Sequence, residues 1–492
     1  MSFEQVKQKM YEIKQLSSIS SLLSWDMEVK MPQGSNKSFR ADQSSFINGM
    51  IHERSTSLEL EKLIDNLLND STLTDENKLE IAILKKRIDK AKKLSKAFVE
   101  KESKVTSEAY SIWEHAKKDS DFKLFQPALS QIVDLLKEKC DLLEYEAHPY
   151  NALLDNFEEE MTVAKLDPLF QDVEKRLSVL IERVIAKQNA KTNFLTQKFD
   201  IEKQVALNHR ILDTLGVNSE LYRMDVSSHP FCTSFHNTDV RITTRYNEND
   251  LMSSIWSAIH ESGHARYEMG LVNGTSGMPS TEAVSLGIHE SQSRFWENNI
   301  GRSMAFIELI YPLIAEFFPQ EMKNVNPKQL FDEINYIEPT LIRTESDELT
   351  YHYHIMIRYE IEKKLISGEL KVADVRDFWN DTYRKYLKIE VPTDTQGCLQ
   401  DVHWSFGGIG YFPTYSLGSF FAAQWYQTIG KNENIDSLIR NKEFTKINQW
   451  HSEHIHQYGA LYNSDNLCQK ATGKSLDFSE FETYILNKFN IV

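Results

Sequence analysis

Cysteine, glycine and proline are all scarce in this chain. The 4 cysteines among 492 residues are scattered and form no C-x-x-C pair, which argues against a disulfide framework and predicts reduced thiols. The 18 glycines and 12 prolines together fall below the average share of roughly 12 per cent, which favours long uninterrupted helices over sheets and turns. No run of 18 apolar residues occurs, so we expect no membrane partner.

Basic residues are also outnumbered. The 56 lysines and arginines stand against 72 aspartates and glutamates, and the formal net charge of -16 argues against a nucleic-acid partner. The first residues, Met1–Gln5, show no basic segment followed by an apolar core, so we expect no export signal. Together with the scattered cysteines, this pattern predicts a cytoplasmic protein.

The sequence His260-Glu261-Ser262-Gly263-His264 has the HExxH arrangement. Residues four apart lie on the same face of a helix, so the two imidazoles can converge on one metal ion, and Glu261 can act as general base toward water. Apolar residues recur at helical spacing from Leu251 to Met269, with Asn249 or Asp250 as a plausible N-cap. The pattern predicts a zinc site that needs a third ligand. The alternative is a buried helix whose histidines only satisfy hydrogen bonds in the core.

A second helical pattern covers residues 281–298, and we expect Ser280 or Thr281 to cap it. A catalytic zinc site keeps three protein ligands and leaves the fourth position to water. The candidates for the third ligand are Glu282, His289, Glu290 and Glu297. The pattern alone does not choose between His289 and Glu290.

Several blocks of the sequence resemble, in the same order, the Taq-type family of zinc carboxypeptidases. Besides the two metal helices, the blocks are Leu22–Asp26, Asp239–Thr243, Ile342–Asp347, Gly397–Trp404 and His456–Gly459. In that family HExxH is followed by a helix that carries His-Glu-Ser-Gln, which is His289–Gln292 here. The resemblance implies Glu290 as the third ligand, one zinc or cobalt ion per chain, a deep central groove and a cytosolic homodimer.

Peptide hydrolysis also needs donors that point at the developing oxyanion. The candidates are His403, in the Gln-Asp-Val-His-Trp sequence, and Tyr411 and Tyr415, which follow a glycine-rich segment. A phenol or an imidazole N–H can donate to a tetrahedral oxygen. The alternative is that this aromatic run is ordinary packing.

A carboxypeptidase must also recognise a free carboxylate, and arginine suits this role because its planar fork binds a carboxylate through two hydrogen bonds. Arg343 and Arg241 are the leading candidates, and both lie in blocks that resemble the family. Which of them binds the substrate stays open at this point. Each could instead form a structural ion pair, with Asp347 or Asp239 respectively.

Four other histidines draw attention. His451 and His454 are three apart on a predicted helix and could hold a second metal ion, although solvated or capped imidazoles on a helix face are the simpler interpretation. His352 and His354 lie in a long amphipathic helix, where we expect them to make hydrogen bonds in the core.

Amphipathic helical patterns follow one another along the chain, so the sequence predicts a large, mostly α fold. Residues 222–246 are the exception, because β-branched and aromatic residues there indicate a small short-stranded sheet just before the HExxH helix. We find no repeat or linker and expect a single integrated peptidase domain over residues 1–492. Within it, 1–120 would form a helical, lid-like portion, 221–300 the strands and zinc helices, and 340–425 the substrate-binding and oxyanion side.

These observations predict a zinc-dependent carboxypeptidase that releases single amino acids from the free C-terminus of peptides with broad specificity. Glu261 would activate water and then protonate the leaving amine. A dipeptidyl carboxypeptidase or an oligoendopeptidase could use the same zinc site. A non-enzymatic helical binding protein is the last alternative, and the intact Glu261 argues against it because a pure binding site needs no base.

Overall fold

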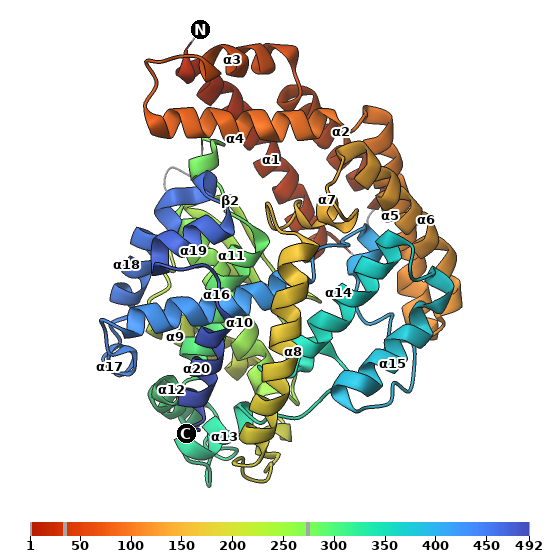
Figure 1. Ribbon diagram of the computed structural model, residues 1–492. Helices are drawn as coiled ribbons and strands as arrows, with labels where there is room; N and C mark the ends of the chain where they lie inside the picture. The colour runs from red at the N-terminus through yellow and green to blue at the C-terminus, as the bar shows by residue number, and fades with distance from the viewer. Residues whose placement is uncertain (1, 33–36, 272–275, 492) are drawn as a thin grey trace. The chain divides into compact units, whose positions relative to one another are not determined.

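The computed structural model describes residues 2–32, 37–271 and 276–491, and most of this backbone is helical (Figure 1). The prediction of a mostly α fold is therefore confirmed. Contacts divide the chain into two compact units. Unit 1 consists of Met1–Ala91, Ala190–Ile334 and Phe421–Asp477, and unit 2 consists of Lys92–Asn189, Asn335–Phe420 and Phe478–Val492. The expectation of a single integrated domain stays a prediction.

Each unit is built mainly of helices from separate parts of the chain. Those of unit 1 are α1 (Phe3–Val29), α2 (Lys37–Ser55), α3 (Leu58–Leu68), α4 (Asp75–Lys92), η1 (Phe194–Thr196), α9 (Ile201–Thr214), α10 (Leu251–Gly270), η2 (Pro279–Thr281), α11 (Leu286–Arg294), η3 (Phe295–Gly301), α12 (Met304–Phe317), α13 (Pro327–Ile334), α17 (Ile435–Arg440), α18 (Phe444–His454), η7 (His456–Leu461) and α19 (Ser464–Thr472). Those of unit 2 are α5 (Lys96–Asp119), α6 (Phe122–Leu143), α7 (Tyr150–Leu154), α8 (Val163–Ile185), η4 (Arg343–Glu345), α14 (Tyr351–Ser367), η5 (Val372–Asp374), α15 (Val375–Leu387), η6 (His403–Phe406) and α20 (Phe478–Lys488), while α16 (Pro413–Gly430) has residues in both units. Among the described residues, no helix is both long and apolar enough to cross a membrane.

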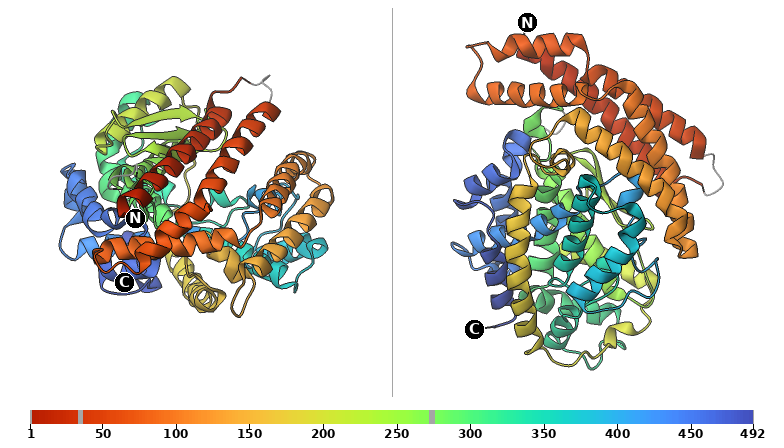
Figure 2. Two further views of the ribbon diagram at one scale, coloured as in Figure 1. Left: turned by 90° about the horizontal axis from the view of Figure 1, so that it is seen from above. Right: turned by 45° about the vertical axis from the view of Figure 1, so that its right-hand side comes forward.

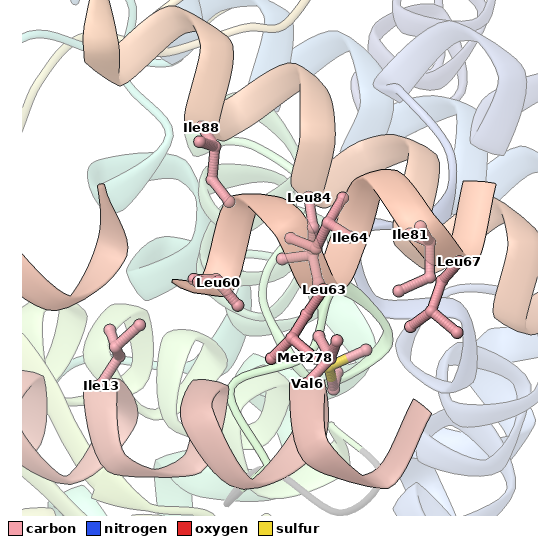
Figure 3. Close-up of a cluster of buried hydrophobic side chains, with 10 residues drawn as sticks. All are labelled: Val6, Ile13, Leu60, Leu63, Ile64, Leu67, Ile81, Leu84, Ile88 and Met278. Atoms are coloured by element: carbon pink, nitrogen blue, oxygen red, sulfur yellow. The ribbon is translucent and has the colours of Figure 1, made fainter. Parts of the chain in front are cut away.

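The first helices of unit 1 are joined by apolar packing. Helices α1 and α2 run side by side (Figure 2), and α3 presents apolar residues at spacings of three and four to α1 and α4. The buried cluster consists of Val6, Ile13, Leu60, Leu63, Ile64, Leu67, Ile81, Leu84, Ile88 and Met278 (Figure 3). Burying one such side chain contributes about 1.5–3 kcal/mol. Because Met278 belongs to the segment that leads into α11, this packing also fixes the approach to that helix.

The sheet lies directly before the HExxH helix, as predicted. It consists of β1 (Tyr222–Val226), β2 (Cys232–His236) and β3 (Asp239–Thr244). The strand order is β1-β3-β2, with β1 parallel and β2 antiparallel to β3. Helix α10 packs against β3 and β2, so the sheet forms one wall behind the motif helix.

The second metal helix begins later than the sequence predicted. Helix α11 starts at Leu286, and the hydroxyl of Ser285, not Ser280 or Thr281, accepts the N–H of Ile288 at 3.0 Å. Tertiary contacts hold the preceding residues out of the helix. Arg87 pairs with Glu282 at 2.6 Å, and the N–H of Val284 donates to the Tyr267 hydroxyl at 3.1 Å. The predicted cap was wrong because local sequence does not report these long-range partners.

Candidate metal centre

Helix α10 supplies His260, Glu261 and His264 from one stretch of regular helix. Its first turn is closed by Asp250, whose carboxylate accepts the N–H of Ser253 at 3.0 Å, so Asp250 and not Asn249 is the N-cap. Gly263 lies between the two histidines where α11 approaches closely. A Cβ at this position would lie 2.6 Å from the carbonyl oxygen of Gln292, so only glycine permits this approach.

The close approach of α11 brings Glu290 to the two histidines. Nε2 of His260 and Nε2 of His264 each lie 3.6 Å from Oε2 of Glu290, and the three ligand atoms all lie within 4.8 Å of one another. A tetrahedral ion with ligand bonds of 2.0–2.1 Å would separate its ligands by about 3.4 Å. The spacing of the three donor atoms is therefore compatible with one divalent metal ion held among them. Among the described residues, no other group of His, Cys, Asp or Glu has this geometry.

Further charged side chains hold the three candidate ligands in place. Nδ1 of His260 donates to Glu297 at 2.8 Å, and Glu297 also accepts from Arg302 at 2.8 Å. Arg294 donates to the second oxygen of Glu290 at 2.7 Å. Burial alone would raise the pKa of Glu297, but the charges of Arg294 and Arg302 lower it well below its usual range. Glu297 therefore stays a carboxylate that orients the His260 ring.

Glu297 lies in η3, a π-helix that directly continues α11. Such segments are rare and are often found at functional sites. Of the four candidates on the predicted second helix, the structure thus places Glu290 in the ligand group and Glu297 beside His260. His289 contacts the far nitrogen of His264, and Glu282 pairs with Arg87.

Glu261 has the environment of a proton acceptor. It is 5 % exposed, and its Oε2 atom has no hydrogen-bond partner among the residues that the structure describes. Burial raises the pKa of Glu261 to about 7, and the neighbouring Glu290 carboxylate adds to the rise. A cation held by the three ligands would oppose this rise. A buried carboxylate that is not committed to another bond can take up a proton from a reactant beside it.

Arg241 lies in unit 1, as the three candidate metal ligands do, and it forms an ion pair with Asp239. Its guanidinium donates to both oxygens of Asp239, at 2.5 and 3.1 Å, and lies over the rings of Trp25 and Phe235 at 5.2 Å each. The ion pair with Asp239 that the sequence offered as an alternative is therefore present.

The other predicted substrate-side residues cluster in unit 2. Nε2 of His403 lies 3.1 Å from the Tyr415 hydroxyl, and the Tyr411 ring lies 5.1 Å from His403 and 5.2 Å from Tyr415. The guanidinium of Arg343 lies 4.9 Å from the centre of the Tyr415 ring. The arginine predicted to bind the substrate carboxylate and the three residues predicted to donate to the oxyanion thus lie in one cluster.

The ion-pair partner of Arg343 is Asp401, not Asp347. Arg343 donates to Oδ1 of Asp401 at 2.9 Å, and the fully buried Arg358 donates to Oδ2 at 2.7 Å. Asp347 instead caps the following helical turn by accepting the N–H groups of Leu349 and Thr350. Asp401 lies in the Gln-Asp-Val-His-Trp sequence, but its partners Arg343 and Arg358 are distant from it in the chain. The spacing of residues in the sequence therefore did not predict these ion pairs.

The other noted histidines have structural environments. His451 is 1 % exposed and packs on Phe295 at 4.4 Å, and His454 stacks on Trp450 at 4.7 Å. Neither belongs to a metal-ligating group among the described residues. His352 and His354 contact Ser416 and Tyr383 through hydrogen bonds of 2.9 Å, as expected of core histidines.

Comparison with known proteins identifies the family of this chain. The family model for carboxypeptidase Taq (M32) metallopeptidases matches residues 5–489. Carboxypeptidase 1 of Bacillus subtilis (strain 168) is 38% identical, with 97% of this chain and 96% of the relative covered. Thermostable carboxypeptidase 1 of Pyrococcus furiosus is 36% identical, with 99% and 98% covered.

Solved structures give the same result for the fold. The crystal structure of an M32 carboxypeptidase from Deinococcus radiodurans R1 matches with a TM-score of 0.95 at 32% identity, and covers 99% of this chain and 98% of the other. This chain therefore shares its fold with that solved carboxypeptidase.

Proposed function

As a member of the carboxypeptidase Taq (M32) metallopeptidase family, to which this chain belongs, the protein is a metal-dependent carboxypeptidase, and we propose that it uses zinc to release single C-terminal amino acids from peptides. The observation that carries this proposal is the convergence of His260, His264 and Glu290 beside the buried Glu261. Cobalt could replace zinc at the same ligands.

The ligand set supports zinc as the ion. Two imidazole nitrogens and one carboxylate oxygen are a common set for catalytic zinc, which keeps a fourth position open. A bound ion of this kind supplies Lewis-acid chemistry, because it polarises the scissile carbonyl and acidifies water. His260, His264 and Glu290 would hold the ion, and Glu297 and Arg294 would keep the ligands in orientation.

Glu261 is the proposed general base and acid. Its carboxylate would take one proton from the attacking water and donate it to the leaving amine nitrogen when the C–N bond breaks. The water oxygen ends in the new carboxylate, and the amine leaves as the N-terminus of the free amino acid. The buried position of Glu261 supports this role, since no side chain in the described part of the chain forms a hydrogen bond with its Oε2 atom.

Arg343 is the preferred candidate for the substrate carboxylate. Arg343 and Arg358 share the single carboxylate of Asp401, which leaves one positive charge in excess, whereas Arg241 and Asp239 neutralise each other. A substrate carboxylate would neutralise the excess positive charge of Arg343, Arg358 and Asp401. His403, Tyr411 and Tyr415 lie in the same cluster and are the proposed donors to the oxyanion.

Two other proposals concern the protein in the cell. We infer a cytoplasmic homodimer, as the family resemblance implies. The four cysteines are all free thiols, which supports a reducing compartment. Light scattering of the purified protein at several concentrations would give the mass of the assembly, and a mass of one chain at all of them would contradict the dimer.

The reaction can be tested with one blocked peptide and an unbiased peptide pool. We expect mass spectrometry to show stepwise loss of single C-terminal residues of many types, loss of activity with a chelator, and recovery with Zn²⁺. Dipeptide products would indicate a dipeptidyl carboxypeptidase, and internal fragments an oligoendopeptidase. Absence of any hydrolysis with added metal would contradict the function.

A further inference from the structure

His289 connects one metal ligand to a second carboxylate. Its Nδ1 atom lies 2.5 Å from Nδ1 of His264, and its Nε2 atom lies 2.8 Å from Oε1 of Glu268. Glu268 follows His264 by one turn on α10, and His289 directly precedes Glu290 on α11. His289 and Glu268 thus extend a chain of hydrogen bonds that begins at Nδ1 of His264. This is the ring nitrogen that does not face Glu290.

Metal binding by His264 determines where the protons lie along this chain of hydrogen bonds. Nε2 of His264 is the atom 3.6 Å from Glu290, so it must keep its lone pair for the ion, and a neutral ring then carries its proton on Nδ1. Two ring nitrogens 2.5 Å apart hold one proton between them, so Nδ1 of His289 accepts it. His289 therefore carries its own proton on Nε2 and donates it to Glu268. Only this assignment satisfies all three side chains.

The surrounding contacts keep His289 in place. Its ring meets the ring of Tyr267 edge to face at 5.1 Å, and the Tyr267 hydroxyl accepts the N–H of Val284 just before α11. The side chains of His289 and Glu268 are 18% and 21% exposed, so solvent reaches them only in part. A mostly shielded ring with both nitrogens engaged has little freedom to turn.

The two histidine ligands are supported differently. His260 donates directly to the carboxylate of Glu297, whereas His264 reaches the carboxylate of Glu268 only through a neutral ring. The interposed ring places the charge of Glu268 farther from the ion. Such support fixes the tautomer and direction of His264 while it adds less negative charge near the ion.

We propose that His289 is a positioning residue of the metal site, which accepts the Nδ1 proton of His264 and so holds Nε2 of that ring toward the ion. This inference rests on the proposed metal site and adds a role for the histidine that precedes the third ligand. It also explains why His289 is not itself a ligand, since its two nitrogens are both used by His264 and Glu268.

Two substitutions separate the two bonds of His289. The Oδ1 atom of asparagine occupies nearly the place of Nδ1 in histidine, whereas the amide of glutamine occupies nearly that of Nε2. His289→Asn thus keeps an acceptor for His264, and His289→Gln keeps only the donor to Glu268. We expect Zn²⁺ to bind His289→Gln about 10- to 100-fold more weakly than wild type, and His289→Asn to stay close to wild type.

The measurement is the Zn²⁺ dissociation constant, from competition with a chromophoric chelator at fixed pH, together with the visible spectrum of the Co²⁺-loaded proteins. We expect the Co²⁺ bands of His289→Gln to change and those of His289→Asn to match wild type. His454→Asn and His454→Gln are matched controls in the same unit, because that ring stacks on Trp450. Both controls should bind Zn²⁺ as wild type does.

Equal affinities of His289→Asn and His289→Gln, whether both strong or both weak, would overturn the proposal. Circular dichroism of the metal-free variants checks that they are folded. Should His289→Gln not fold, His289→Ala replaces it, because it also removes the acceptor for Nδ1 of His264 and should weaken Zn²⁺ binding in the same direction; unchanged affinity there would also overturn the proposal. Failure of the wild type to bind one equivalent of Zn²⁺ would instead contradict the proposed function.

Discussion

The guanidinium of Arg343 and the carboxylate of Asp401 form a buried ion pair, with 2.9 Å between Nη2 and Oδ1. Nη2 of Arg358 lies 2.6 Å from the other oxygen, Oδ2, of Asp401. Burial alone would raise the pKa of Asp401, but the charges of the two arginines lower it far below its usual range. One carboxylate thus holds two buried cations, and the group keeps an excess positive charge.

Replacement of Asp401 by asparagine should destabilise the protein strongly. Removal of one partner from a buried ion pair costs about 3–5 kcal/mol, because the remaining charge is left without compensation. We expect urea unfolding at neutral pH to shift to a clearly lower midpoint. Asp381→Asn removes an exposed pair with Arg384 and should change the midpoint little, so equal shifts in the two variants would contradict this account.

The pH dependence of this effect has a definite sign. Because the pKa of Asp401 is lowered in the folded protein, its contribution to stability is present above the ordinary pKa of about 3.9 and is lost as the pH falls below that value. The stabilities of wild type and Asp401→Asn should therefore converge in acid. A difference that stays constant down to low pH would argue against the ion pair as its cause.

Arg343 should decide whether the enzyme distinguishes a free carboxylate from an amide. We expect Arg343→Lys to raise KM for a free-acid peptide by about 10- to 100-fold, because a lysine cannot reproduce the two-pronged contact. The preference for the free acid over the C-terminal amide should fall by a similar factor. Arg241→Lys is the matched variant and should keep that preference. Loss of the preference in Arg241→Lys alone would reverse the assignment.

The bond between His403 and Tyr415 should make their contributions to catalysis interdependent. We expect His403→Gln and Tyr415→Phe each to lower kcat by about 100-fold, as removal of a donor to the oxyanion does, with a smaller effect on KM. The double variant should lose less than the product of the two single losses, since the side chains act as a unit. Tyr386→Phe, elsewhere in the same unit, serves as the control. Strictly multiplicative losses would indicate independent roles.

Much of the candidate metal site could be predicted because its parts are close in the sequence. His260, Glu261 and His264 share one helix, and helical spacing alone fixes their common face. The strands before that helix were also recognisable from β-branched and aromatic residues. The choice of Glu290 over His289 came from family resemblance, because adjacent residues on a helix give no internal reason to prefer either.

The supporting residues could not be predicted, since their partners lie far away in the chain. The bonds from Glu297 to His260 and from Asp401 to both arginines depend on how helices pack. The start of α11 was missed because Arg87 and Tyr267 hold the preceding segment in another conformation. Gly263 did offer a signal, because a glycine between the two motif histidines indicates that another backbone comes close.

Glu261→Gln offers the most direct test of the central claim, which is that a carboxylate beside a three-ligand metal site moves the proton in peptide hydrolysis. The variant keeps the shape of the side chain and all three ligands, so it should bind one equivalent of Zn²⁺ with nearly unchanged affinity. We expect its kcat for release of a C-terminal amino acid to fall by at least about 100-fold. A metal-loaded Glu261→Gln protein that hydrolyses peptides at the wild-type rate would contradict the account.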